Sequence, residues 1–201
     1  FDFGFYVIIG GASAMLISKV DMIMISKYLD LEHVAYYTIA FYIGNAIKIP
    51  ARSLISISVP LLAESWEKGD MQKLQLLYTK SAINLLVVGG CFFLLVWLNI
   101  DDVFLLLPEK FSHGKHVVLF IALGQLFNIS SGLNGSIIIN SRYYRWDLAF
   151  NLFLLVFTII TNMLFIPVSS PFATYGIVGI NGAAFATALS ILLFNIFKML
   201  F

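Results

Sequence analysis

Long apolar runs alternate with short polar joints along the chain, and each run is long enough to form a membrane helix. A helix needs about 20 apolar residues to cross the hydrocarbon core of a bilayer. The runs lack the strict alternation that is typical of membrane strands, so the pattern predicts an all-α, polytopic membrane protein. We expect one bundle of six transmembrane helices, over residues 3–26, 34–63, 81–100, 117–139, 148–166 and 175–201.

Two segments have patterns of their own. In "ESWEKGDMQKLQLLYTK", which joins the second and third runs, Met71, Leu74 and Tyr78 recur at helical spacing. This spacing predicts a short amphipathic helix at the membrane surface. The sixth run begins with the glycine-rich stretch "YGIVGINGAA", which we expect to be a loop that turns into a helix.

Composition supports the membrane class. Hydrophobic residues make up 60% of the chain and charged residues 11%, whereas a soluble domain has about 25% charged residues. The net charge of +1 gives no reason to expect nucleic acid as a partner. The single cysteine, Cys91, has no partner for a disulfide. Both ends of the sequence lie in or beside apolar segments, and we expect the chain to be a fragment of a longer membrane protein.

Lysine and arginine are distributed unevenly between the two predicted sides of the membrane, and such residues are more frequent in cytoplasmic joints. The joints after the second and fourth helices, with the chain end, therefore indicate the cytoplasmic side, and the first residue is expected there too. The more basic side has Lys68, Lys73, Lys80, Arg142, Arg145 and Lys198, and the other has Lys27, Lys110 and Lys115.

Two basic residues lie near the middle of the second run, in "NAIKIPARSL". Lys48 and Arg52 are four apart and share a helix face, which Asn45 joins. Stacked cations repel each other, and an anion bound between them, such as a diphosphate, would relieve the repulsion. Pro50 is expected to bend this helix and to free the carbonyl of Ala46. Alternatively, both cations extend to the membrane surface.

The first run also contains charged residues, in "ISKVDMIMIS". Lys19 and Asp21 are two apart, so they do not face each other on a helix and each needs another partner or water. We consider Lys19 a further candidate contact for an anionic substrate. Asp21 is a candidate proton or sodium site, or a gate that pairs with a cation such as Arg52. The alternative for Asp21 is extension to the nearby membrane surface.

A series of amide side chains lies along the fourth predicted helix. Hydrogen bonding between helices is the common reason for such residues in membranes, and lining a sugar-binding cavity is the alternative. The candidates for lining a cavity are Gln125, Asn128 and Asn134, and Asn140 continues the series.

The sequence contains no motif of a hydrolase, of a nucleotide-binding loop or of a zinc site. Its three histidines, His33, His113 and His116, lie in predicted joints, so we expect no metal, no cofactor and no enzymatic activity. A membrane enzyme of polysaccharide assembly remains an alternative, although such an enzyme would need a long loop that carries the chemistry, and the joints here are short.

Four segments, in this order, resemble a known family. They are "DMIMISKYLDLEHVAYYTIAFYI", "IPARSLISISVPLLAESWEKGDMQKLQLLYTKS", "GLNGSIIINSRYYRWDLAFN" and "NMLFIP" followed by "YGIVGINGAAFATALS". The chain resembles the polysaccharide biosynthesis (O-antigen type) flippases of the multidrug, oligosaccharidyl-lipid and polysaccharide exporter superfamily.

That resemblance implies an architecture of two six-helix lobes that face each other across a cavity. This chain would be one lobe, more similar to the C-terminal one, and its partner would be the second lobe of the same protein. The implied activity is the transfer of an undecaprenyl-diphosphate-linked oligosaccharide across the cytoplasmic membrane of a bacterium by alternating access, with Lys48 and Arg52 at the diphosphate. A multidrug transporter lobe of the same superfamily is the alternative, although acidic rather than basic cavity residues would suit cationic drugs.

Overall fold

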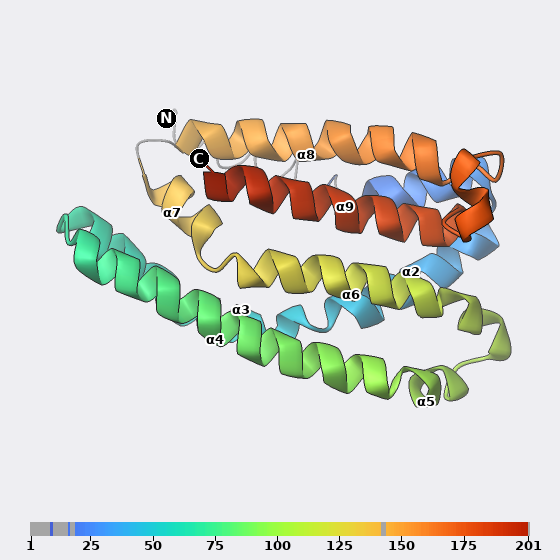
Figure 1. Cartoon of the computed structure of the whole chain (residues 1–201), viewed down its shortest axis with the longest axis horizontal. Helices are drawn as coiled ribbons and strands as arrows, with labels where there is room; N and C mark the ends of the chain where they lie inside the picture. Colours follow the sequence, from blue (N-terminus) through green and yellow to red (C-terminus); the bar gives the residue numbers. More distant parts are fainter. Residues whose placement is uncertain (1–8, 10–15, 17–18, 142–143, 201) are drawn as a thin grey trace.

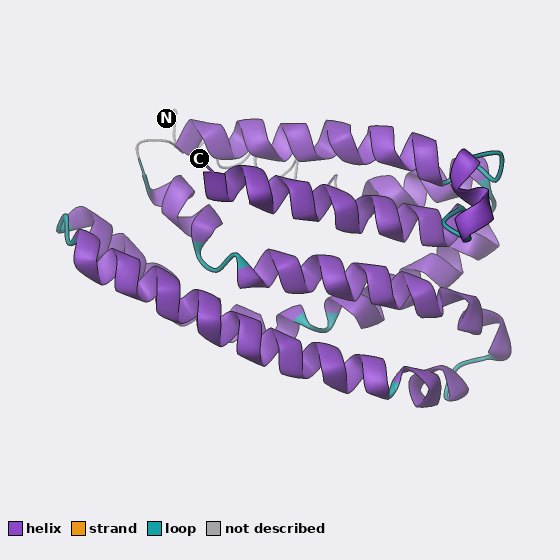
Figure 2. Cartoon of the chain, viewed as in Figure 1, coloured by secondary structure: helices purple, strands orange, loops and turns teal. Residues whose placement is uncertain are grey.

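The computed structural model describes residues 9, 16, 19–141 and 144–200, and this part of the chain contains helices and no strands (Figure 2). The all-α prediction is confirmed. Residues 19–28 form a helix. The elements that follow it are α2 (Leu31–Asn45), α3 (Lys48–Glu67), α4 (Met71–Leu98), α5 (Ile100–Leu105), η1 (Glu109–Gly114), α6 (Lys115–Ser130), α7 (Asn134–Asn140), α8 (Tyr144–Phe165), η2 (Pro171–Tyr175) and α9 (Gly179–Leu200).

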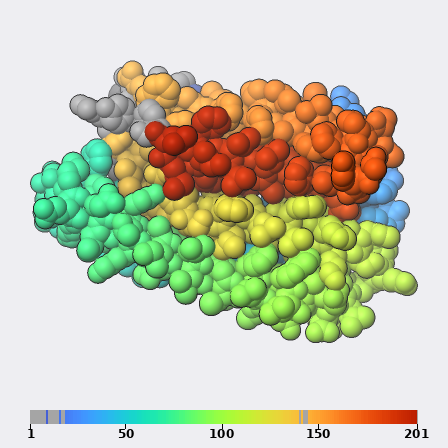
Figure 3. Space-filling model, in the orientation of Figure 1, coloured from blue at the N-terminus to red at the C-terminus, as the bar shows by residue number. Residues whose placement is uncertain are grey.

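The long helices lie roughly side by side in a bundle. Figure 1 shows α8 and α9 as neighbours that run in opposite directions, with α6 beside α9 and α4 beyond α6. On the other side, α2 packs against α6, and α3 packs against α4. The space-filling view shows the face that α4, α6, α8 and α9 form (Figure 3). In this arrangement α6 and α9 each contact at least three long helices, and one side of α4 is uncovered.

Small residues allow the central helices to approach closely. A Cβ on Gly124 of α6 would lie 3.0 Å from Cα of Ala188 in α9, and a Cβ on Gly182 would lie 2.0 Å from the carbonyl oxygen of Phe165. Such close packing drives helix association where lipid removes the hydrophobic driving force. The glycines therefore fix the positions of α6 and α8 against α9.

Three helices in the described part of the chain are long and apolar enough to cross a membrane, and a bent helix pair raises this number to four. The run predicted as one bent membrane helix over residues 34–63 is divided into α2 and α3, which meet at an angle of 48°. The helix predicted over residues 117–139 is also divided: α6 ends at Ser130, and Gly132 has a φ of +67°, which other residues rarely adopt. The first predicted helix lies largely outside the described residues.

The expected bend is present, and Pro50 lies about one turn after it. Pro50 lies in the first turn of α3, where a backbone donor is not needed, and the break precedes it at the turn formed by residues 46 and 47. The carbonyl oxygen of Ala46 accepts a hydrogen bond from the N–H of Ile49 at 3.0 Å. The expectation that Pro50 frees this carbonyl is therefore wrong.

The joint predicted between the second and third helices is mostly helical. The amphipathic segment and the third run form one continuous helix of 28 residues, α4. Asp70 caps the start of α4, since its side chain accepts a hydrogen bond from the backbone N–H of Lys73 at 2.9 Å. No proline occurs within α4, and the helix has no break. The expected irregular start of the sixth run is present as η2, with Gly176 and Gly179 at positive φ.

Candidate functional site

Asp21 is buried among four helices. Its side chain is 1% exposed, and its carboxylate accepts three hydrogen bonds. They come from the hydroxyl of Tyr37 in α2 at 2.6 Å, the amide of Asn162 in α8 at 2.7 Å and the hydroxyl of Thr187 in α9 at 2.6 Å. The alternative in which Asp21 extends to the membrane surface is therefore wrong.

The environment of Asp21 suits a bound cation or proton. Carboxylate, amide and hydroxyl oxygens are the ligands that hard cations prefer. The Oδ1 atom of Asn162 is buried and has no hydrogen-bond donor within the described part of the chain. This acceptor belongs to the same side chain that donates to Asp21. No group of three or more histidine, cysteine or acidic side chains that could hold a metal occurs among residues 19–141 and 144–200.

Asp21 lines a cavity of about 210 Å³, which we call the Asp21 cavity. This space would hold roughly seven water molecules at about 30 Å³ each. Its polar lining residues come from the first helix, α3, α6, α8 and α9 and comprise Asp21, Lys48, Gln125, Asn128, Asn151, Thr158 and Thr187. The cavity therefore brings one carboxylate and one ammonium group together with neutral donors and acceptors.

Four of the residues proposed from the sequence line this cavity: Asp21, Lys48, Gln125 and Asn128. The other four lie elsewhere and make different contacts, as described next.

Lys19 is exposed on the first helix. Asn45 donates its amide to the carbonyl oxygen of Phe41, one turn earlier in its own helix, at 2.7 Å. Asn134 donates its amide to the carbonyl oxygen of Lys198 at 3.1 Å. The Asn45 amide bonds within its own helix and the Asn134 amide bonds to α9, and neither residue lines the Asp21 cavity.

Arg52 lies one turn after Lys48 on α3, but it is exposed and does not line the Asp21 cavity. Ser53 and Ser56, on the same helix, are exposed as well. These three residues form what we call the polar face of α3. Ile49 and Ile57 on this side of the helix are also exposed, so Arg52 is the one residue of the polar face of α3 that would be costly beside lipid.

The amides of α6 form a hydrogen-bonded network with α9. Asn128 donates to Gln125 at 3.3 Å, Asn195 donates to Asn128 at 3.2 Å, and Ser131 donates to Asn195 at 2.9 Å. Both sequence interpretations of these amides thus have structural support, because Asn128 accepts a hydrogen bond from α9, and Gln125 and Asn128 both line the cavity.

A buried ion pair, which the sequence did not predict, lies beside the Asp21 cavity. Lys198 of α9 donates to Asp147 of α8 at 2.7 Å, and their side chains are 7% and 15% exposed. Asn151 donates to the second oxygen of Asp147 at 3.0 Å, and the Lys198 ammonium lies 4.4 Å from the ring centre of Phe194. Asn151 and Phe194 also line the cavity.

The partners of Asp21 were missed as well. Tyr37, Asn162 and Thr187 each occur as a polar residue within an apolar run. A polar residue in such a run can mark a functional site, and this was the signal in the sequence that could have identified them. This signal does not show which of these residues bond to Asp21, because they lie 16, 141 and 166 residues from Asp21 in the sequence.

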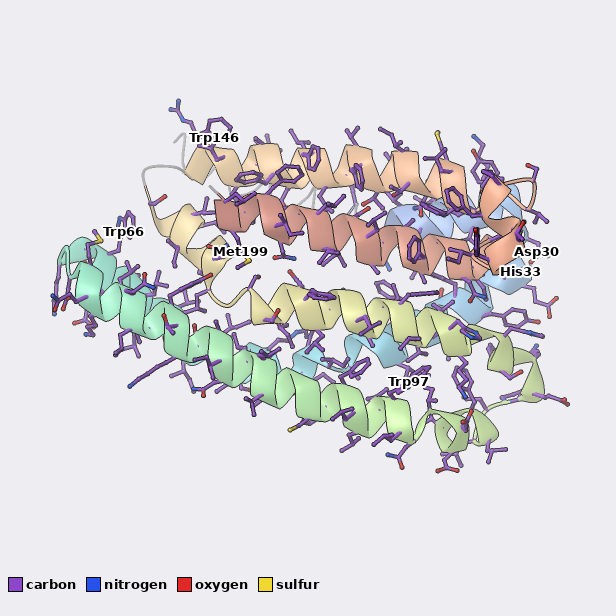
Figure 4. The ribbon with its side chains drawn as sticks, viewed as in Figure 1. Asp30, His33, Trp66, Trp97, Trp146 and Met199 are labelled. Carbon is purple, nitrogen blue, oxygen red and sulfur yellow. The ribbon has the colours of Figure 1, made fainter. Side chains whose placement is uncertain are left out.

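One end of the bundle has a separate acid–imidazole contact. Figure 4 places Asp30 and His33 at this end and Trp66, Trp146 and Met199 at the opposite end. Asp30 begins α2 and accepts the backbone N–H of His33 at 2.8 Å. This hydrogen bond, followed by the one from the His33 ring, lowers the pKa of the Asp30 carboxyl.

A family model, one relative and one solved structure match this chain. The MatE family model matches residues 7–164. An uncharacterized membrane protein of Methanocaldococcus jannaschii is 26% identical over 216 residues, which cover 100% of this chain and 38% of that protein. A multidrug resistance MATE family transporter of the MOP superfamily, solved in an outward-facing conformation, gives a TM-score of 0.76 at 18% identity and covers 96% of this chain and 42% of that chain. The chain thus spans less than half the length of either protein.

Proposed function

The chain belongs to the MatE family, and from this premise we propose that it forms one lobe of an alternating-access transporter. The second lobe belongs to the same protein and faces the polar face of α3. The proposed substrate is a lipid-linked oligosaccharide with a diphosphate group, which moves across the cytoplasmic membrane of a bacterium during the synthesis of a surface polysaccharide.

Asp21 carries the transport proposal. A carboxylate at membrane depth is costly and marks ion or proton pathways in transporters. Three donors from three helices hold Asp21, so a proton or sodium ion that binds the carboxylate competes with bonds between helices. Loss or gain of that ion would change the packing of the first helix against α2, α8 and α9. Asp21 is thus the proposed coupling site.

Lys48 and Arg52 support an anionic substrate. Lys48 lines the Asp21 cavity and Arg52 lies on the adjoining polar face of α3. Lysine provides a point charge and arginine a two-pronged fork for phosphate oxygens. The Asp21 cavity of about 210 Å³ is smaller than the roughly 300–1,000 Å³ of drug-sized pockets. The diphosphate would therefore contact α3 in the space between the lobes, and not inside this cavity.

A second candidate substrate is an organic cation. Asp21 offers a negative charge in the cavity, which would attract such a molecule, and a structurally similar chain is a multidrug resistance transporter. The same lobe architecture serves both proposals, so the substrate must be tested directly.

Complementation of a flippase-deficient strain tests the lipid-linked substrate. We expect the full-length gene to restore surface glycan, and Lys48→Ala and Arg52→Ala to abolish it while the protein remains inserted in the membrane. Lys73→Ala, which removes a cation of α4 outside the cavity, is the control and should restore glycan fully. If Lys48→Ala and Arg52→Ala also restore glycan, the anion-binding role is wrong.

Efflux of a cationic dye by the same strains tests the alternative. Asp21→Asn should abolish transport of either substrate, because the coupling carboxylate is lost. Dye efflux that depends on Asp21, with no glycan restored by any variant, would favour the organic-cation substrate. Full transport by Asp21→Asn would exclude Asp21 as the coupling site.

A further inference from the structure

An apolar groove of about 250 Å³ lies on the outside of the bundle, between the first helix and α8. We call it the Lys27 groove. Its lining comprises Val20, Ile23, Met24, Lys27 and Tyr28 from the first helix, with Ile159 and Met163 from α8. It shares no residue with the lining of the Asp21 cavity. Ile23 and Met163 are 62% and 51% exposed, so this groove is open to whatever surrounds the bundle.

The groove has one charged residue, at the end of the first helix. The helix ends at residue 28, and the Lys27 ammonium lies 5.9 Å from the ring centre of Tyr28. No acidic side chain pairs with Lys27 in the parts of the chain that the structure describes. Lysine and tyrosine at a helix end are typical of the membrane–water interface. The groove thus combines an apolar floor with an unneutralised cation at one end, the pattern expected where a groove runs from the hydrocarbon core to the headgroups.

The chemistry of this groove matches one occupant, an anionic phospholipid. Val20, Ile23, Met24 and Ile159 offer contacts for an acyl chain. The Lys27 ammonium offers a point charge for the phosphate. A zwitterionic lipid would gain the same apolar contacts but less from Lys27, since its own ammonium offsets the phosphate charge.

The Lys27 groove and the Asp21 site are opposite sides of the same contact between helices. Val20 precedes Asp21 in the chain, and Ile159 and Met163 lie close to Asn162 on α8. Asn162 donates to Asp21 at 2.7 Å, inside the bundle, where both residues are buried. A molecule bound in the groove would therefore affect the distance between the first helix and α8, which this hydrogen bond joins.

We propose that the Lys27 groove binds one anionic phospholipid, with its phosphate at Lys27 and an acyl chain along the groove. The bound lipid fills the space between the first helix and α8 and favours the packing in which Asn162 donates to Asp21. The lipid composition of the membrane then acts on the site at Asp21 without entering the cavity.

Native mass spectrometry of the full-length protein with phosphatidylglycerol tests the site. We expect Lys27→Gln to weaken binding by about fivefold, the contribution of one lysine near an anionic lipid. Met163→Trp, which fills the groove and keeps the charge, should also displace the lipid. The control is Lys110→Gln, which removes an exposed lysine of η1 outside the groove and should leave the affinity unchanged.

Hydrogen–deuterium exchange of residues 19–28 in nanodiscs gives a second measurement. Exchange should be slower in phosphatidylglycerol than in phosphatidylethanolamine for the wild type, and the difference should disappear in Lys27→Gln. Equal affinity of Lys27→Gln and wild type for phosphatidylglycerol would overturn the proposal. So would an equal loss in Lys110→Gln, which would indicate diffuse attraction to surface charge, or equal exchange in the two lipids.

Discussion

Buried charges in this protein are stabilised by partners on other helices. Asp21 accepts three hydrogen bonds and Lys198 pairs with Asp147. An uncompensated charge at these positions would be expensive, because burial removes water without replacing its hydrogen bonds. The charged residues whose burial in a membrane would cost free energy are thus the residues that join one helix to another.

Removal of one donor to Asp21 should destabilise the bundle. We expect Asn162→Ala to lower the free energy of unfolding by about 1.5–3 kcal/mol, the range for hydrogen bonds to charged groups. Thermal unfolding of the full-length protein in detergent measures the change. The control is Asn99→Ala, since the Asn99 amide bonds only within its own helix and is exposed; its effect should stay within about 0.5 kcal/mol. Equal melting temperatures for the two variants would contradict the prediction.

The Asp147–Lys198 pair should behave as a buried unit. Lys198→Met alone leaves a carboxylate without its cation and should cost about 3–5 kcal/mol, whereas the double variant with Asp147→Leu should cost much less. A double-mutant cycle on the free energy of unfolding measures this coupling. The matched control is the exposed pair Lys115–Asp101, where Lys115→Met should cost about 1 kcal/mol or less. Additive effects at Asp147 and Lys198 would show that the pair is not coupled.

At the scale of the helices, close contacts decide where the elements lie. The α2–α3 bend places Lys48 at the start of α3 and at the Asp21 cavity. The packing of α8 against α9 depends on Gly182, which has no room for a side chain. These features position the donors of Asp21 from α8 and α9.

A methyl group at Gly182 should disturb this packing. A Cβ there would lie 2.0 Å from a backbone oxygen of Phe165, which cannot move without shifting α8, so we expect Gly182→Ala to cost about 3 kcal/mol or more. Gly90→Ala is the control, because Gly90 is also within a helix but has no neighbour within 4 Å of an added Cβ. It should gain about 0.5–1 kcal/mol. The melting temperatures of the two variants should therefore change in opposite directions.

At the scale of the whole molecule, two exposed surfaces differ in character. The uncovered side of α4 is apolar, with Leu94 and Leu95 more than half exposed, whereas the polar face of α3 includes Arg52 and two serines. The first surface suits lipid and the second suits water or another lobe. In the proposed two-lobe arrangement, the uncovered side of α4 would face lipid and the polar face of α3 would face the space between the lobes.

Cysteine labelling of the full-length protein distinguishes these surfaces. With Cys91→Ala as background, Ser56→Cys on α3 should react with a charged, water-soluble maleimide, because it faces a wet cavity. Leu95→Cys on α4 is 58% exposed in this structure but should remain unlabelled in the membrane, because lipid covers it. Equal labelling of both positions would contradict the assignment of the two surfaces.

The sequence by itself determined the class of the protein. Apolar runs and scarce charge established a helical membrane protein, because hydropathy is a local property that needs no knowledge of neighbours. The superfamily inferred from the order of its motifs agrees with membership of the MatE family, while the polysaccharide flippase branch stays a prediction. Asp21, Lys48, Gln125 and Asn128 were selected from the sequence and line one cavity.

Only the tertiary structure decided how these residues are paired. A bend near Pro50 was expected from the sequence, and the structure places it at a turn formed by residues 46 and 47. Lys48 and Arg52 lie one turn apart on α3, as helical spacing predicts, but only Lys48 lines the Asp21 cavity, and Arg52 is exposed. Asp21 finds Asn162 and Thr187 more than 140 residues away. Hydrogen bonds between helices depend on which faces meet, and that is a property of the packed bundle and not of any one segment.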